Sequence, residues 1–315
     1  PIDIRQHLGV LDELGYLAAS WMWVEDVPAD STGNLLLNSR GEPHFSWQID
    51  SVKWYKSCPV RGVALANHIQ NERMSGHNAQ HFDVTASRIG LECFHPDHPL
   101  DRRDDALWRR RILETSFSKG NVVSSEGFWG YATPSYDIGS VKIPTAIHAD
   151  WFTIPLTSLV YHDSCIHDWW EVDNYNNGHH RLQGGRGQEY FPMGGGWMEE
   201  QALQDALAGW PPNIMPFGAQ YQYVNGRAPE TELYRFEIEM PEVKAALKLA
   251  IPVARLHGRV GKAACIDHHI HAVDGSVQST IFANGTTVYA NFGADTVELP
   301  GVGLLSPKTW KSADP

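Results

Sequence analysis

The 315-residue chain has an ordinary globular composition, with 42% hydrophobic residues, 20% charged residues and a formal net charge of −12 at pH 7. This negative charge argues against nucleic acid or an anionic membrane as the main partner. No apolar run approaches the roughly 20 residues that a membrane-spanning helix needs.

Helix and strand patterns alternate through the first 260 residues. Residues 2–16 have apolar side chains at helical spacing and a Gly15 cap, and residues 102–120 have acidic residues in their first turn. In chain order, the patterns predict a helix at 2–16, a strand at 16–26, a loop at 28–46, a helix at 59–74, a strand at 78–87, a helix at 102–120, a strand at 121–127, a strand-like apolar stretch at 151–164, and helices at 196–210 and 240–258.

The pattern changes to short alternating strands after about residue 260. Asn284-Gly285 lies between two such strands, which is a strong signal for a tight β-hairpin. We therefore predict two domains, a β/α domain at residues 1–260 and a small all-β sandwich domain at residues 261–315.

Alternating strands and helices favour a parallel β/α architecture. Glycine-rich nucleotide-binding motifs of the GxGxxG or GxxxxGK[ST] type are absent, whereas acidic residues gather where strands end. We therefore predict a (β/α)8-type barrel, whose strand ends line one mouth. The patterns indicate about six strands, and the chain begins at Pro1. We therefore expect an upstream domain or the first strands to be missing from this chain.

Two carboxylates follow consecutive strands of the predicted barrel. Asp83 lies at the end of the strand in "HFDVTAS", and Glu126 ends "NVVSSE" immediately before Gly127 and three aromatic residues. Burial among rings raises the pKa of a carboxyl group, which suits a general acid. Two carboxylates about 5 Å apart across a glycosidic bond form a retaining glycosidase site. An alternative interpretation is that each residue is a loop cap or a salt-bridge partner.

Other residues near strand ends are candidates for binding a sugar, since aromatic faces suit the C–H face of a sugar ring and polar groups suit its hydroxyls. The candidate substrate-binding residues are Trp23, Asp26, Trp129, Tyr131, His148, Asp150, Trp151, His162 and Asp163. Trp129 and Tyr131 are the strongest aromatic candidates because they closely follow Glu126.

Four segments carry a resemblance to a known family. "HFDVTAS", "HPDHPLDRRDDALWRRRILE", "NVVSSEGFWGYATPSYDIG" and "IPLTSLVYHDS" occur in this order and resemble the catalytic barrel of endo-α-N-acetylgalactosaminidase-like glycoside hydrolases and their uncharacterised bacterial relatives. The resemblance implies a nucleophile at Asp83, an acid/base at Glu126 and a glycan substrate, either an oligosaccharide or a glycoconjugate. It covers residues 1–260, and "FANGTTVYANFG" is similar to the β-sandwich that follows such barrels.

Two alternatives remain open at this stage. The histidines in "HDSCIHD" and "DHHIH" permit a metal-dependent barrel hydrolase or isomerase, although HExxH is absent. A non-catalytic carbohydrate-binding barrel is the other alternative. The four cysteines are far apart in the sequence and form no CxxC pair, so they predict buried thiols rather than a disulfide framework or a zinc knuckle. We expect no cofactor and no metal in the catalytic site.

Overall fold

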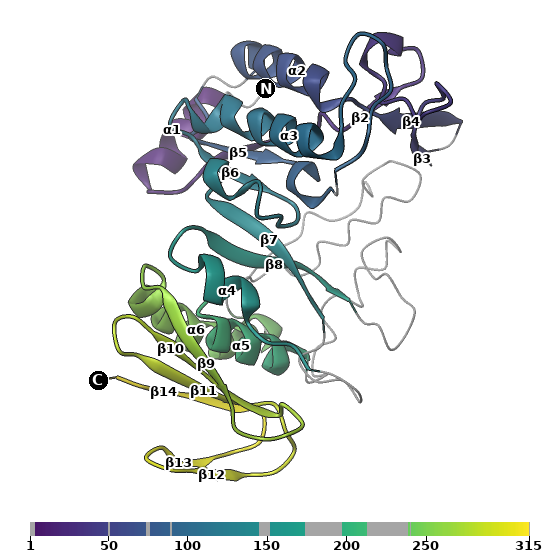
Figure 1. Ribbon diagram of the computed structural model, residues 1–315. Coiled ribbons are helices and arrows are strands. Elements are labelled where there is room, and N and C mark those ends of the chain that lie inside the picture. Colours follow the sequence, from purple (N-terminus) through teal and green to yellow (C-terminus); the bar gives the residue numbers. More distant parts are fainter. Residues whose placement is uncertain are drawn as a thin grey trace. The chain divides into compact units, whose positions relative to one another are not determined.

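The computed structural model describes residues 4–49, 51–73, 76–88, 90–144, 152–173, 197–212, 239 and 241–314 (Figure 1). The chain divides into two compact units, residues 1–141 and 142–315, and each is described by itself. The predicted domain boundary at residue 260 stays a prediction.

The first unit alternates strands and helices. Its elements are α1 (Ile4–Glu13), β1 (Ala19–Met22), β2 (Asp26–Pro28), η1 (Thr32–Asn34), β3 (Phe45–Ile49), β4 (Val52–Lys56), α2 (Pro59–Arg73), β5 (Ala79–Phe82), η2 (Thr85–Ser87), α3 (Arg102–Phe117), β6 (Val122–Ser125) and η3 (Thr133–Ser135), and β7 (Ile138–Pro144) spans the boundary between the units.

A parallel sheet organises the first unit, with β1, β5, β6 and β7 as successive neighbours. Phe82 pairs in register with Met22 on one side and with Ser125 on the other. Neighbouring strands in a sheet lie about 4.8 Å apart. The residues that directly follow Phe82 and Ser125 therefore leave the same edge of the sheet side by side.

Helices α2 and α3 lie beside each other and cover one face of this sheet (Figure 1). Their apolar residues Ala66, Ile112 and Leu113 pack on Phe82 and Val123 in one buried cluster. Helix α3 begins where predicted because the side chain of Asp101 caps it, accepting a hydrogen bond from the Asp104 backbone N–H.

A second, antiparallel sheet of order β2-β4-β3 precedes α2. The sequence patterns predicted a loop at residues 28–46 and did not predict the β3–β4 hairpin. The strand predicted at 16–26 ends at Met22, and Asp26 begins β2 rather than ending β1.

The second unit combines helices with an antiparallel sheet. Its elements are α4 (Leu156–Tyr161), β8 (Ile166–Asp173), α5 (Trp197–Ala208), α6 (Pro241–Val260), β9 (Cys265–Ile270), β10 (Val277–Phe282), β11 (Thr287–Asn291), β12 (Val297–Leu299), β13 (Gly303–Leu305) and β14 (Thr309–Ala313).

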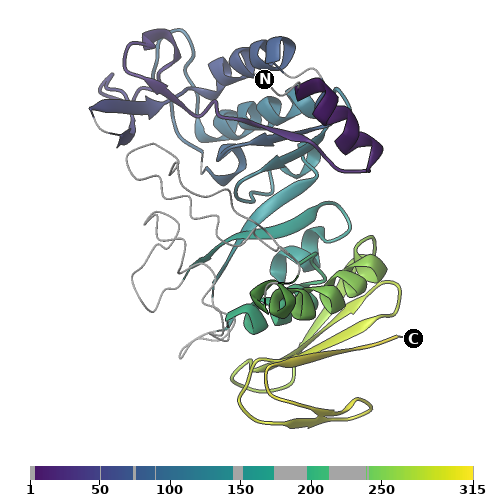
Figure 2. The ribbon, with the colours of Figure 1, turned by 180° about the vertical axis from the view of Figure 1, so that it is seen from behind.

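The C-terminal sheet has the order β14-β11-β10-β9, and the predicted hairpin joins β10 and β11 with Gly285 at φ 89°. Helices α5 and α6 pack on this sheet, as the view from behind shows (Figure 2), through a cluster that includes Ala206, Val253, Leu256 and Phe282. The predicted all-β character of the C-terminal region is therefore observed.

The strand predicted at residues 151–164 is wrong, since Leu156–Tyr161 form helix α4 directly after Pro155. Proline has no N–H to donate to a strand ladder but fits the start of a helix, which explains the difference. Strands β7 and β8 were not predicted. Among the described residues, no helix is long and apolar enough to cross a membrane.

Candidate active site

Asp83 is the first residue after β5, and the backbone around it is tightly held. Its backbone N–H donates to the carbonyl of Met22 at 2.8 Å. The next residue, Val84, has φ 48° and ψ 4°, a left-handed conformation that is strained for a β-branched side chain. Strained backbone of this kind tends to occur at functional sites.

Glu126 follows β6, and the glycine after it has a structural reason. Gly127 has φ +74°, and a Cβ on it would lie 2.4 Å from the Cα of Ser87. Only a glycine therefore lets the turn that carries Glu126 approach η2, the turn that follows Asp83.

Hydrogen bonds connect these two turns directly. The Ala86 N–H donates to Ser125 Oγ at 2.9 Å. The hydroxyl of Tyr131 lies within hydrogen-bond distance of the carbonyl oxygens of Thr85, at 3.1 Å, and Arg88, at 3.3 Å. The two carboxylate-bearing segments therefore form one rigid unit at the edge of the sheet.

The side chains of Asp83 and Glu126 are both half-buried and are hydrogen-bonded to each other. Burial raises the pKa of Asp83 above its usual value of 3.8, and the negative charge of Asp26 adds to this rise. The hydrogen bond to Glu126 and the positive charge of Arg88 act in the opposite direction. Two carboxyl groups in contact avoid double ionisation by holding a proton between them.

Asp26 lies close enough to influence Asp83 electrostatically, but its own carboxylate is occupied. It is buried and accepts hydrogen bonds from Lys56 Nζ at 2.8 Å and from the indole N–H groups of Trp23 and Trp47, both at 3.2 Å. Arg88 Nη2 lies 3.6 Å from Asp26 Oδ2, the oxygen that both indoles contact. This arrangement fits a positioning role better than direct contact with a sugar.

The pKa of Asp26 reflects these partners. Burial by itself would raise it, but hydrogen bonds from Lys56 and Ser46 and the charges of Lys56 and Arg88 outweigh burial and hold it below 3.8. Asp26 and Asp83 are therefore neighbouring acids whose pKa values are shifted in opposite directions, a separation typical of functional sites.

A cluster of tryptophans surrounds Asp26. Trp23 stacks on Trp47 with ring centroids 5.1 Å apart, and Trp54 lies 5.3 Å from Trp47. The ring of Trp21 next to them is 61% exposed. The sequence patterns identified Trp23 but missed Trp47, Trp54, Lys56 and Arg88. The aromatic residues Phe45, Trp47, Trp54 and Tyr55, which lie close together in the sequence, were the signal that could have revealed the hairpin.

The two aromatic candidates after Glu126 have different environments. Trp129 is 44% exposed, so its ring is available for contact. Tyr131 packs on the main core cluster of the first unit, and its hydroxyl faces backbone carbonyls. Contact of either residue with a sugar stays a prediction.

The remaining candidates lie elsewhere. His162 belongs to the second unit, where it is buried with Nδ1 2.7 Å from the Ala263 carbonyl and Nε2 3.0 Å from the Gly209 carbonyl. Asp163 is exposed and accepts a hydrogen bond from Ser164. His148, Asp150 and Trp151 lie outside the described residues.

The histidine-rich segments do not form a metal centre within the part of the chain that the structure describes. On β9, His269 pairs with Asp267 at 3.3 Å and His268 faces Gln278, and His271, directly after β9, faces Ser279. These imidazoles are occupied by neighbouring polar side chains and do not converge on one point.

Comparisons with known proteins identify the fold. No protein-family model matches the chain, and no similar sequence was found among curated proteins. Among solved structures, the α-N-acetylgalactosaminidase NagBb from Bifidobacterium bifidum matches 98% of this chain with a TM-score of 0.70 and 19% sequence identity. The chain spans 44% of that protein's chain, less than half its length.

Two further glycoside hydrolases are similar in structure. A GH31 family sulfoquinovosidase from E. rectale matches 99% of this chain and 51% of its own, with a TM-score of 0.57 and 8% identity. A cyclic α-maltosyl-(1→6)-maltose hydrolase from Arthrobacter globiformis matches 98% of this chain and 77% of its own, with a TM-score of 0.52 and 11% identity. The predicted fold class, a glycosidase-type barrel with a C-terminal all-β region, is confirmed.

Proposed function

We propose that the chain carries the catalytic site of a retaining glycoside hydrolase that cleaves an α-linked glycan. Asp83 is the nucleophile and Glu126 is the acid/base. One observation carries the proposal: the two carboxyl groups follow register partners on neighbouring parallel strands and are hydrogen-bonded to each other. Retaining glycosidases hold two carboxyl groups about 5 Å apart with the sugar between them. The hydrogen-bonded pair is closer than this, so the mechanism requires the two side chains to separate when the sugar binds.

The proposed mechanism assigns the two carboxyl groups different roles. Burial raises the pKa of Asp83 overall, whereas the hydrogen bond to Glu126 and the charge of Arg88 favour its ionised form. The proposed roles require the shared proton to be on Glu126 when the sugar binds. An ionised Asp83 can attack, and a protonated Glu126 can donate.

The proposed reaction has two steps, which form and then hydrolyse a covalent sugar–enzyme intermediate. An oxygen of Asp83 bonds to the anomeric carbon as the glycosidic bond breaks, and Glu126 gives its proton to the departing oxygen. The Glu126 carboxylate then takes a proton from a water molecule, whose oxygen displaces Asp83 from the anomeric carbon. Both carboxyl groups return to their starting states, and the sugar keeps its anomeric configuration.

The substrate class follows from the exposed aromatic rings and from the structural neighbours. Trp129, which closely follows Glu126, is half-exposed and offers a flat apolar face to a sugar ring. NagBb is by its name an α-N-acetylgalactosaminidase. We therefore place an α-linked N-acetylgalactosaminide first among candidate substrates, as part of an oligosaccharide or glycoconjugate.

The proposal is tested by assaying the purified chain on aryl α-glycosides, beginning with the N-acetylgalactosaminide, galactoside and glucoside. We expect turnover of at least one, and losses of about 100-fold or more in Asp83→Asn and Glu126→Gln. Matched control variants are Asp295→Asn and Glu298→Gln, because both side chains are exposed on the C-terminal β region.

Two results would overturn the proposal. One is near-normal turnover by both active-site variants. The other is binding of these glycosides with no release of product, which would favour the carbohydrate-binding barrel.

A further inference from the structure

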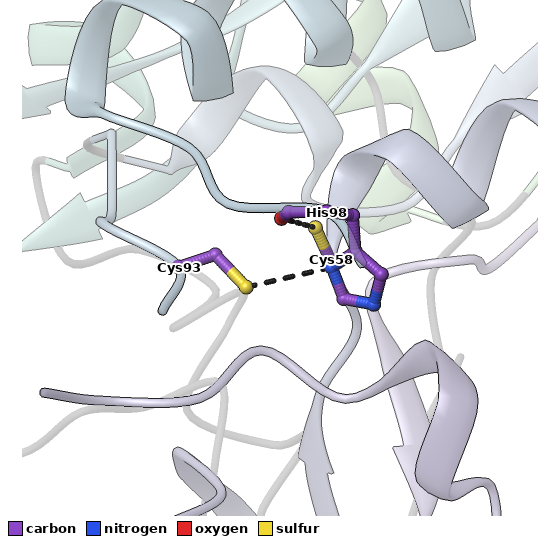
Figure 3. A group of neighbouring side chains, drawn as sticks. All are labelled: Cys58, Cys93 and His98. Carbon is purple, nitrogen blue, oxygen red and sulfur yellow. Dashed lines mark hydrogen bonds between the residues drawn. The ribbon is translucent and has the colours of Figure 1, made fainter. Parts of the chain in front are cut away.

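Three soft metal-ligand side chains converge in the first unit, and the reaction proposed above does not use them. Cys58, Cys93 and His98 are all buried, with exposed fractions of 0%, 2% and 4%. Their ligand atoms, two Sγ and one imidazole nitrogen, all lie within 4.8 Å of one another. Figure 3 shows the three side chains gathered together, Cys58 from the position directly before α2 and Cys93 and His98 from one short loop.

The backbone holds each of these residues in place. Cys58 directly precedes α2, and its N–H donates to the carbonyl of Asn34 at 2.8 Å. Cys93 forms an isolated antiparallel bridge with Leu100, with two reciprocal hydrogen bonds of 2.9 Å. His98 lies within the short loop that this bridge closes. The three donors are therefore positioned by main-chain contacts.

The distances fit a tetrahedral zinc site. Cys93 Sγ lies 3.6 Å from His98 Nδ1. Zinc bonds of about 2.3 Å to sulfur and about 2.0 Å to nitrogen, at a tetrahedral angle, separate these two atoms by about 3.5 Å. An ion can thus be accommodated with little movement of either side chain.

The imidazole of His98 is also oriented as a ligand. Its Nε2 lies 3.3 Å from the carbonyl oxygen of Gly33. A proton on Nε2 can be donated to that carbonyl, which leaves Nδ1, the atom facing Cys93, with a free lone pair. Metal-binding histidines usually have an outer partner of this kind on the second ring nitrogen.

Charge balance favours a divalent ion here. Leu36 and Leu100 form a buried apolar cluster with the two cysteines, and Trp108 packs against it. An isolated charge in such surroundings is costly. Two thiolates and one Zn²⁺ together have no net charge. The metal complex therefore avoids the free-energy cost that a single buried thiolate would have.

We propose that Cys58, Cys93 and His98 bind one structural Zn²⁺ ion. Both thiols release their protons to solvent on binding, and a water molecule completes the tetrahedron. The ion joins the η1 turn, the start of α2 and the loop at residues 93–98. That loop belongs to the segment between Arg88 and α3, so the ion stabilises the region that leads away from Asp83.

The direct test is zinc content. The chain is produced in zinc-supplemented medium, purified without chelator and analysed by elemental mass spectrometry. We expect about one zinc per chain, with two sulfur ligands and one nitrogen ligand in X-ray absorption of the wild-type protein. Cys93→Ala and His98→Ala should lose most of the zinc. The matched control, Cys265→Ala, removes a buried thiol outside the cluster and should keep it.

A second measurement uses only the wild-type protein, so it remains decisive if the variants fail to fold. Chelation should lower the melting temperature, added Zn²⁺ should restore it, and Co²⁺ should produce a sulfur-to-metal charge-transfer absorption. A wild-type chain with less than about a tenth of an equivalent of zinc and no uptake would overturn the proposal. A disulfide between Cys58 and Cys93, found by alkylation without reduction, would also overturn it.

Discussion

The two units of the chain both contain many titratable side chains, but they use them differently. In the first unit, the carboxyl groups of Asp83 and Glu126 contact each other beside a strained residue, Val84, and Asp26 adds a further negative charge. In the second unit, the buried ring of His162 faces two backbone carbonyls, and the histidines of β9 face polar neighbours.

The comparison shows that partners, rather than residue type, mark a reactive site. Like charges held together and strained backbone lower the stability of a fold and persist where other interactions enforce them. A histidine whose nitrogens face backbone carbonyls mainly contributes to folding. The acids of the first unit are therefore expected to control catalysis, and the histidines of the second unit to control stability.

The largest expected effect comes from the acid/base. Replacing Glu126 with Gln should lower kcat/KM on a glycoside with a poor leaving group by about 10²–10⁴-fold, because no proton reaches the departing oxygen. With an activated aryl glycoside, whose leaving group needs little protonation, the loss should be much smaller. Steady-state kinetics on the two substrates checks this, and equal losses on both would argue against the acid role.

Substitutions at two glycines, Gly127 and a control, test the packing that brings Asp83 and Glu126 together. Gly127→Ala should lower the free energy of unfolding by about 2 kcal/mol or more, because it combines a left-handed φ with a clash against Ser87. Activity should fall with it. The control is Gly120→Ala, whose φ is +81° but whose added Cβ meets nothing within 4 Å. Chemical denaturation measures both variants. If Gly120→Ala loses as much free energy of unfolding as Gly127→Ala, the close approach of Gly127 to Ser87 does not explain the effect.

The second unit should respond in stability. His162→Ala leaves the Ala263 carbonyl without its ring partner, whereas the Gly209 carbonyl keeps His257 Nδ1 at 2.8 Å, and it should lower the free energy of unfolding by about 1–3 kcal/mol. Denaturant titration measures this effect. A variant with unchanged stability and strongly reduced turnover would contradict this prediction and would support His162 as a substrate-binding residue.

Asp83 and Asp26 should shift stability in opposite directions at pH 7. The fold raises the pKa of Asp83, so its contribution to stability is present below pH 3.8 and is lost as the pH rises through its folded pKa. The fold lowers the pKa of Asp26, so its contribution is present above pH 3.8 and is lost as the pH falls through its folded pKa.

At pH 7, Asp83→Asn should therefore raise the melting temperature, and Asp26→Asn should lower it, each by on the order of 2 °C. The Asp83→Asn difference should disappear as the pH falls through the raised folded pKa to 3.8, and the Asp26→Asn difference should shrink as the pH falls below 3.8. Thermal scans between pH 3 and pH 7 measure them. Shifts of the same sign in both variants would contradict the assigned electrostatics.

The smallest effect is expected at the exposed ring after the acid/base. Trp129→Ala removes a flat apolar surface that is 44% exposed and should raise KM by about 5-fold, with little change in the melting temperature. Trp129→Phe is the conservative control and should retain most of the affinity. An unchanged KM in Trp129→Ala would remove this ring from the proposed sugar contacts.

The sequence predicted the elements whose signals are local. Helices α2, α3, α5 and α6 and the β10–β11 hairpin were all predicted, and of these α3 carries the Asp101 cap and the hairpin carries Asn284-Gly285. The positions of Asp83 and Glu126 after two strands were also predicted, because strand ends are visible in the apolar pattern.

The sequence patterns did not predict contacts between segments that are distant in the sequence. The β3–β4 hairpin that brings Trp47 and Lys56 to Asp26 depends on non-local pairing. Cys58 and Cys93 are separated by a whole helix and a strand, so their spacing resembles no metal motif. Pro155 was interpreted as a weak point in a strand, although it stands directly before helix α4.

The most direct test of the central claim is to trap the intermediate. The chain is incubated with a slow mechanism-based inactivator, such as a fluorinated α-glycosyl fluoride of the preferred sugar, and the labelled peptide is identified by mass spectrometry. We predict a covalent sugar on Asp83, formed faster in wild type than in Glu126→Gln. A label on a different carboxylate, or turnover of substrate with inverted anomeric configuration, would contradict the account.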